Sequence, residues 1–380
     1  MKKLFVCAGV LVGFVLFVIT HGVAQGAEMN SNNLNERVSR LEEKLDEGIL
    51  EKLMEKFHIS GVVELEAYYM LYNPDGNDDL NESDITLATV ELGIDIDIHE
   101  YVKGHILFLW EEDDTEPVDI DEGTITLGAA EGIPFYLTAG KLYAPFGMFE
   151  SHFISDPLTL EIGETRESAA VIGYTNDIVD ISFSLFNGDI NNEGRDEVLE
   201  HFVVSAIFTP PVHKLEGLQV FCGASYISNI ADSDTLQEMI YDPNTDDTIH
   251  EVHDYVDGVG IFLCAEYKGS FFNAEYIGAL EAFGVGEFGG PDYGPDYTLM
   301  ALKPKTWNVE LAHCLTENLK IAGKYEGSDD LGALFPETQY GIAISHNLFA
   351  NTVISFEYLY GEFENNDNRN LFTTQLAIEF

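Results

Sequence analysis

Charged side chains stand among large apolar ones in the segment 144–167, which includes Phe146, Phe149 and Ile154. Such a segment is poorly suited to extend into water, so we expect it to fold inward and pack on other parts of the protein. In a channel, rings of charged side chains at a narrow point select ions. The candidate constriction residues are Asp156, Glu161, Glu164, Arg166 and Glu167.

Two alternatives for this segment stay open. Its apolar residues could form a contact between subunits instead of packing on the inner wall. Arg166 could simply form an internal ion pair with Glu164 and Glu167, which are its neighbours in the sequence.

Further charged residues lie in stretches where apolar and polar residues alternate. A lysine that faces lipid in mid-membrane costs about 2–4 kcal/mol, so we predict that these charges face a lumen. Lys141 is the least clear, because both faces of 134–143 are mixed. For most of the set, keeping a passage hydrated is a sufficient role. The candidate lumen-facing residues are Glu91, Asp95, Asp97, Lys141, Asp180, Glu266, Glu275, Glu310, Lys320, Lys324 and Glu357.

A weaker candidate is a metal site at His250 and His253, in the acidic stretch 247–254. Imidazole and carboxylate groups can bind divalent metals, but this spacing is not a strong metal motif. A solvated acidic loop is the favoured interpretation, as it is for 111–122, where weak calcium or lipopolysaccharide bridging is the alternative. We expect no cofactor. No nucleophile elbow, zinc-protease helix or phosphate loop occurs in the right context, so we predict that the chain is not an enzyme.

The elements that carry these residues have the period of β-strands. In 84–98 and again in 178–186 and 352–360, apolar residues alternate with polar or acidic ones. The same period runs through 370–380 to Phe380. Repeated alternation of this kind is typical of strands that meet lipid on one side and water on the other.

Short and long connections alternate between these strands. Short turns such as 99–100 and 268–270 alternate with long polar loops such as 187–200 and 229–255. Both ends of a bacterial barrel lie in the periplasm, which requires an even number of strands, so we merge the runs on either side of Pro304 into one strand. The predicted fold is an all-β transmembrane barrel of about 16 antiparallel strands, large enough for an aqueous channel.

The N-terminal part has a different character. Residues 1–27 have the basic start, apolar core and small-residue end of a signal peptide. Residues 28–58 contain a polar tether and a short heptad pattern, which predicts a periplasmic coiled-coil helix. This helix could help to form a homotrimer or could pack on its own barrel; the barrel domain is predicted over 59–380.

The formal net charge is −49. Such a charge excludes nucleic-acid binding and favours cations near the surface, including divalent ions that bridge lipopolysaccharide. Solubility or adaptation to a saline habitat is an alternative reason for it. The mature chain would keep Cys222, Cys264 and Cys314, which are widely spaced and form neither a disulfide framework nor a metal motif.

Several runs between 84 and 188 resemble the LbtU-type siderophore porins. These include DITLATVELGIDIDIHEYV, LFLWEEDD, the long stretch FYLTAGKLYAPFGMFESHFISDPLTLEIGETRESA, and LFNGD. The resemblance implies a sixteen-stranded barrel of the bacterial outer membrane without a plug domain, which takes up a ferric siderophore or a similar small iron chelate. It supplies no set of ligand residues.

One property of the chain fits this implication poorly. Polycarboxylate siderophores are anionic, whereas the chain is strongly acidic. Either the chelate contacts basic groups such as Lys141, Arg166, Lys320 and Lys324, or the cargo is different. The alternative function is a general cation-selective diffusion porin with an acidic lumen.

Overall fold

The computed structural model describes residues 55–75, 78–112, 115, 117–130, 132–194, 198–211, 217–242, 247–248, 251–287 and 300–380. Residues Lys56–Phe380 form one unit. The predicted signal peptide, nearly all of the predicted coiled-coil segment, and His250 lie outside the described residues.

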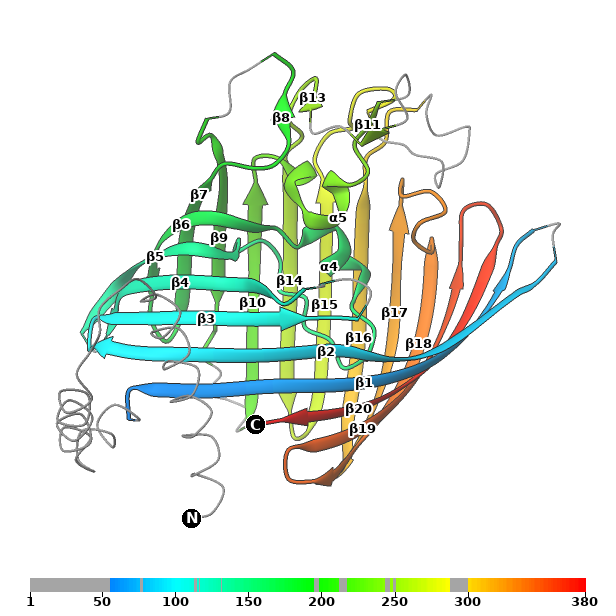
Figure 1. The fold of residues 1–380 in the computed structure, drawn as a ribbon, viewed down its shortest axis with the longest axis horizontal. Coiled ribbons are helices and arrows are strands. Elements are labelled where there is room, and N and C mark those ends of the chain that lie inside the picture. Colours follow the sequence, from blue (N-terminus) through cyan, green and yellow to red (C-terminus); the bar gives the residue numbers. More distant parts are fainter. Residues whose placement is uncertain are drawn as a thin grey trace, which may run out of the picture. The chain divides into compact units, whose positions relative to one another are not determined.

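The described part of the chain forms a closed antiparallel barrel of sixteen strands, as predicted (Figure 1). Each strand pairs with the next in the barrel order, and β1 pairs with β20 to close the sheet. The strands are β1 (Phe57–Asn73), β2 (Leu80–His99), β3 (Val102–Trp110), β4 (Asp119–Ala130), β5 (Ile133–Tyr143), β6 (Arg166–Thr175), β7 (Val179–Phe186), β9 (His201–Phe208), β10 (Leu218–Ile227), β14 (Gly258–Tyr267), β15 (Ser270–Ala279), β16 (Lys305–Thr316), β17 (Leu319–Asp329), β18 (Thr338–Phe349), β19 (Thr352–Glu362) and β20 (Asn368–Glu379).

The last residue takes part in closing the barrel. The N–H of Phe380 donates to the carbonyl of Gly61 over 3.0 Å, and the N–H of Gly61 donates to the carbonyl of Phe380 over 2.9 Å. The period-2 pattern of 370–380 is therefore that of a strand paired on both sides, with β19 and with β1.

The alternation along each strand separates an apolar outer face from an inner face. On β16, Leu311 is exposed, whereas its neighbours Glu310 and Ala312 are buried. On β18, Ile342 and Ile344 are exposed and Ala343 is buried. Exposed apolar side chains at every second position are what a lipid-facing surface requires. Among the described residues, no helix has the length and apolarity needed to cross a membrane.

The region around Pro304 differs in part from the expectation of one long strand. The strand β16 begins at Lys305, and residues 300–304 form no regular structure. Proline has no N–H for the sheet, which explains why the strand starts after it. The carbonyl of Pro304 still accepts a hydrogen bond of 2.9 Å from the N–H of Ala279.

The long connections contain more structure than polar loops would. They carry the short helices α4 (Leu158–Gly163), η1 (Ile230–Asp232) and α5 (Asp234–Gln237). They also carry the short strands β8 (Asn191–Asn192), β11 (Tyr241–Asp242), β12 (Asp247–Thr248) and β13 (Glu251–Val252), of which β8 pairs with β13. The reason is burial, because apolar residues scattered through these loops, such as Ile190, Ile230 and Leu236, are fully buried against one another.

The main hydrophobic core joins these loops to part of the inner wall. Phe146 and Ile162 from the connection between β5 and β6 pack in one cluster with loop residues such as Ile240 and Phe283. The same cluster includes inward residues of the strands β6, β7, β9, β10 and β15. The loops therefore pack on one side of the barrel interior, and their packing sets the position of residues 144–165.

Candidate functional site

The connection between β5 and β6, residues 144–165, lies against the inner wall of the barrel. We call it the inner loop. Its helix α4 contacts β15, β16 and β17, and Figure 1 shows α4 inside the ring of strands. The inner loop is bound to the wall mainly through its backbone N–H groups, which donate to carboxylates of the strands.

Glu275 on β15 is the first of these carboxylates. It accepts hydrogen bonds from the N–H of Met148 over 2.7 Å, from the N–H of Phe149 over 3.0 Å, and from the hydroxyl of Thr159 over 2.9 Å. One buried side chain thus joins two separate parts of the inner loop. Hydrogen bonds to an ionised acceptor are about twice as strong as neutral ones.

Two further glutamates repeat this arrangement. Glu310 on β16 accepts from the hydroxyl of Ser151 and the N–H of His152, both over 2.8 Å. Glu357 on β19 accepts from the N–H of Ile154 over 2.7 Å, and from the N–H and hydroxyl of Ser155 over 3.1 and 2.6 Å. These carboxylates have a structural role, so hydrating a passage is not their main contribution.

A buried ion pair network completes the attachment. The side chain of Lys324 on β17 is fully buried, 3.6 Å from Glu310 and 3.4 Å from Glu326. Its ammonium group donates to the carbonyl of Ser155 over 3.3 Å and lies 4.7 Å from the ring centroid of Phe153. Glu326 in turn accepts from the N–H of Leu158 over 3.0 Å. Lys324 therefore supplies the positive charge that buried carboxylates require.

The other side of the inner loop faces a different wall. Asp156 is exposed, and Coulomb repulsion couples it to Glu64 and Glu66 on β1. It is coupled in the same way to Glu161 and Glu164. We call these five residues the acidic passage: Glu64, Glu66, Asp156, Glu161 and Glu164. None of them forms an ion pair within 4.0 Å among the described residues.

The acids that the inner loop contributes hold protons more tightly than usual. Burial, and then repulsion from Asp156, raise the pKa of Glu161 to about 7. Burial, and then repulsion from Asp234, raise the pKa of Glu164 to about 8. Asp156 is accessible to solvent but enclosed by surrounding protein, and this desolvation raises its pKa, although Lys324 opposes the shift. The charges of Glu161 and Glu164 therefore change most between about pH 6 and pH 9.

Arg166 and Glu167, predicted beside these acids, lie at the start of β6. Neighbouring residues of a strand point to opposite faces, so the two side chains diverge. Arg166 pairs with Asp121 over 2.6 Å and with Asp119 over 3.9 Å, both on β4. Glu167 is buried on the face that carries Ala169 and Val171, which belong to the hydrophobic core.

The remaining predicted lumen residues have individual partners on the strands. Asp95 is 2.8 Å from His105, and Asp97 is 3.3 Å from His58. Asp180 accepts from the hydroxyl of Tyr136 over 3.3 Å. The ammonium group of Lys141 lies 3.9 Å from the carboxylate of Asp119, and that of Lys320 lies 3.5 Å from Nδ1 of His152. Glu91 is repelled by Asp121. Glu266 shares a face of β14 with buried Phe262 and Cys264.

His253, from the weak metal prediction, is an exposed side chain at the loop end. Its Nδ1 atom lies 3.1 Å from Glu287 and 3.5 Å from Glu193. No group of three or more histidines, cysteines or acids in the described part of the chain is arranged to hold a metal ion.

Four charged residues of this candidate site were not predicted from the sequence: Glu64, Glu66, Glu326 and Arg369. Arg369 on β20 donates to Gln339 over 3.0 Å and interacts electrostatically with Glu161 and Glu357. The alternation of β20 carried a usable signal, because Arg369 is an even number of residues from the buried Thr373 and Ala377.

No family model matches the chain. A UPF0422 protein of Coxiella burnetii (strain RSA 493 / Nine Mile phase I) is 24% identical over 286 residues, which are 73% of this chain and 58% of that protein. A UPF0422 protein of Legionella pneumophila (strain Paris) is 28% identical over 115 residues, which are 28% of this chain and 22% of the relative. The chain thus spans less than two thirds of the length of these relatives.

Solved porin structures share the fold. The outer membrane channel DcaP of Acinetobacter baumannii has a TM-score of 0.53 at 14% identity, covering 85% of this chain and 97% of that one. OprB of Pseudomonas putida has a TM-score of 0.58 at 11% identity, and the match covers 87% of this chain and 96% of OprB. OmpF of Salmonella typhi has a TM-score of 0.55 at 10% identity, and the match covers 85% of this chain and 97% of OmpF. At these identities, the similarity establishes a porin-like barrel fold.

Proposed function

We propose that this chain is an outer-membrane channel for small solutes and that it prefers cations. The observation that carries the proposal is the acidic passage, in which acids of the inner loop and of β1 are close enough to repel one another. The exposed apolar outer face and the porin-like fold support a place in the outer membrane.

The charge distribution explains the preference for cations. Carboxylates on two sides of a narrow path raise the local concentration of cations and lower that of anions. Lys324, the most deeply buried lysine among the described residues, is already neutralised by Glu310 and Glu326. Arg369 interacts with Glu161 of the inner loop and is surrounded by several carboxylates, and Lys324 also acts on Asp156.

The ferric-siderophore cargo implied by the resemblance of 84–188 stays a prediction. The acidic passage repels polycarboxylate chelates, so a neutral or cationic iron chelate fits this interior better. The homotrimer and the periplasmic helix also stay predictions.

Planar bilayers test the proposal. Purified protein should insert as stepwise, ohmic conductances, and in a KCl gradient the reversal potential should lie towards the value for potassium. If a ferric chelate is cargo, a cationic hydroxamate complex should reduce the potassium current at lower concentration than an anionic polycarboxylate complex. Absence of conductance, or a reversal potential towards the value for chloride, would contradict the proposal.

A further inference from the structure

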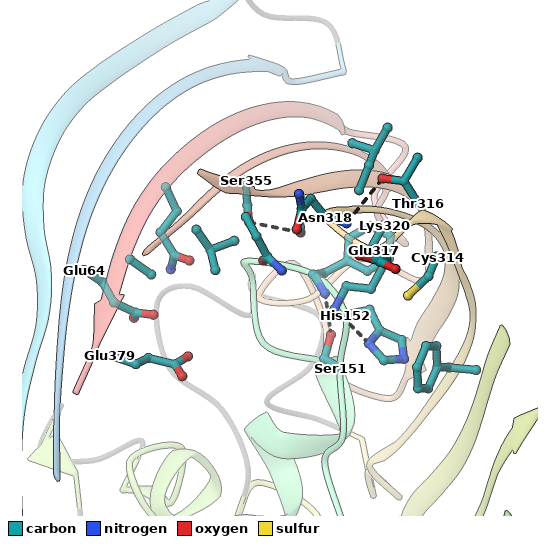
Figure 2. A pocket seen from close by; sticks show the side chains of 18 residues that line it. Glu64, Ser151, His152, Cys314, Thr316, Glu317, Asn318, Lys320, Ser355 and Glu379 are labelled. Atoms are coloured by element: carbon teal, nitrogen blue, oxygen red, sulfur yellow. Dashed lines mark hydrogen bonds between the residues drawn. The ribbon is translucent and has the colours of Figure 1, made fainter. Parts of the chain in front are cut away.

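A pocket of about 450 Å³ lies beside the inner loop, at the end of the barrel where the short turns are (Figure 2). Its lining includes Ser151 and His152 of the inner loop, the turn between β16 and β17, and inward residues of β17 to β20 and β1. The lining residues are mostly polar. The pocket adjoins the ion pair network around Lys324, because Phe153 lines the pocket and lies against Lys324, and because Ser151 and His152 line it and donate to Glu310.

One row of the sheet runs along this wall from Lys320, which lines the pocket, to Glu66, which is two residues from the lining residue Glu64 on β1. Lys320 on β17 pairs in register with Ser345, Ser345 with Ser355, Ser355 with Gln375, and Gln375 with Glu66. Neighbouring strands are about 4.8 Å apart, so the row spans roughly 19 Å along the curved wall. Neutral hydrogen-bonding groups lie between the charges: Ser355 donates to Ser345 over 3.0 Å, and Gln375 donates to Glu66 over 2.9 Å.

Lys320 supplies the positive end of the pocket. Among the described residues no carboxylate lies within 4.0 Å of its ammonium group, in contrast to Lys324. Its polar contact is Nδ1 of His152, at 3.5 Å. Burial and the proximity of Lys320 lower the pKa of His152, which favours the neutral imidazole beside the lysine.

The negative end lies across the open space of the pocket. Figure 2 shows Glu64 and Glu379 on the side opposite to Lys320 and His152, with Ser355 and Asn318 between them. Glu317, in the turn next to Lys320, also lines the pocket and weakens the positive end without forming an ion pair with Lys320. The pocket therefore has opposite charges on opposite sides.

We propose that this pocket binds small zwitterions, with their anionic group at Lys320 and their cationic group at Glu64 and Glu379. A purely anionic solute is repelled by the two glutamates, and a purely cationic solute is repelled by Lys320. A solute that carries both charges, separated by a short polar chain, satisfies both sides. The volume of about 450 Å³ accommodates a short peptide, whose two charged ends lie farther apart than those of a single amino acid. The inference rests on the proposed channel function, for which the pocket would be a binding station on the path.

Three peptides of nearly equal size separate the charges. Triglycine is a zwitterion at pH 7, N-acetyltriglycine lacks the cation, and triglycinamide lacks the anion. Calorimetry with the detergent-solubilised full-length protein should show that triglycine binds about fivefold more tightly than either analogue, since one partly exposed ion pair contributes at most about 1 kcal/mol.

Two variants assign the ends of the pocket. Lys320→Gln should remove the advantage of triglycine over triglycinamide, and Glu64→Gln/Glu379→Gln should remove its advantage over N-acetyltriglycine. The matched control is Lys268→Gln, in the turn between β14 and β15, which lies outside the pocket and over the ring of Tyr267.

The outcomes are distinguishable from those of the channel proposal. Equal binding of the three peptides, or equal effects of Lys320→Gln and Lys268→Gln, would overturn the pocket assignment. A chain that binds triglycine with this selectivity and conducts no ions would keep the pocket and overturn the channel. Glu317→Gln should strengthen binding of N-acetyltriglycine, because it removes a carboxylate beside Lys320.

Discussion

Inward-facing glutamates do different work on two parts of the barrel wall. On β15, β16 and β19, Glu275, Glu310 and Glu357 accept hydrogen bonds from the inner loop. On β1, Glu64 and Glu66 bond to wall residues, and among the described residues they accept none from the inner loop. An inward-facing glutamate thus anchors the inner loop where the loop reaches it, and where no loop reaches it we propose that its charge acts on the ion path.

The largest effect is expected when Lys324, the cation beside the anchoring glutamates, is removed. Lys324→Met removes the ion-pair partner within 4.0 Å of buried Glu310 and Glu326, which should destabilise the barrel by about 3–5 kcal/mol. Thermal unfolding in detergent measures the effect. The exposed Lys268→Met is the control and should change stability by less than about 0.5 kcal/mol. Equal stability of the two variants would contradict a structural role for Lys324.

Removal of one anchor should have a smaller effect. Glu357→Ala deletes the acceptor for Ile154 and Ser155, at an expected cost of about 3 kcal/mol. The inner loop should then become a site of proteolytic cleavage, and single-channel conductance should become noisier. Glu266→Ala, on the inner face of β14, is the control. An inner loop in Glu357→Ala that resists protease as well as it does in the wild type would argue against anchoring by this carboxylate.

The channel charges should respond to pH. Because the pKa values of Glu161 and Glu164 are raised to about 7 and about 8, both are neutral at pH 5.5 and ionised above about pH 9. The preference for potassium over chloride should therefore rise severalfold across this range. Glu164→Gln should remove the upper part of the rise. A reversal potential independent of pH would show that these residues do not face the ion path.

The raised pKa values of Glu161 and Glu164 also make the folding stability depend on pH. Cation preference should rise with pH, whereas this contribution to stability should fall. In the unfolded chain these glutamates titrate near 4.5, below their values in the folded protein. The folded state therefore holds more protons between about pH 4.5 and pH 8, and this contribution to stability falls as pH rises through that window. Glu164→Gln should flatten the pH dependence of the unfolding temperature between pH 6 and pH 8; an unchanged slope would mean that Glu164 titrates normally.

The barrel could be predicted from the sequence because its rule is local. Lipid on one side and water on the other impose a period of two, and Leu311, Ile342 and Phe372 follow it. The strand number followed from the parity of the connections. The internal helices and strands of the loops could not be predicted in this way, because residues such as Ile190 and Leu236 are buried by other loops rather than by a periodic surface.

The sequence predicts which face of a strand a charged side chain lies on more readily than it predicts what that side chain does. Alternation places Glu310 and Glu357 on the inner face, but only the path of the inner loop makes them anchors. Arg166 is adjacent in sequence to Glu167, yet its ion-pair partners Asp119 and Asp121 lie on β4. Such pairings depend on contacts between distant segments, which the spacing of residues along one strand does not encode.

The difference between the two sets of glutamates can be measured in one experiment. The reversal potential in a KCl gradient at pH 7.5 is compared for the wild type, Glu64→Gln/Glu66→Gln and Glu266→Gln. The β1 variant should lose severalfold in cation preference while keeping its unfolding temperature, and Glu266→Gln should resemble the wild type. An unchanged cation preference in the β1 variant, or a loss of equal size in Glu266→Gln, would contradict the assignment of the acidic passage.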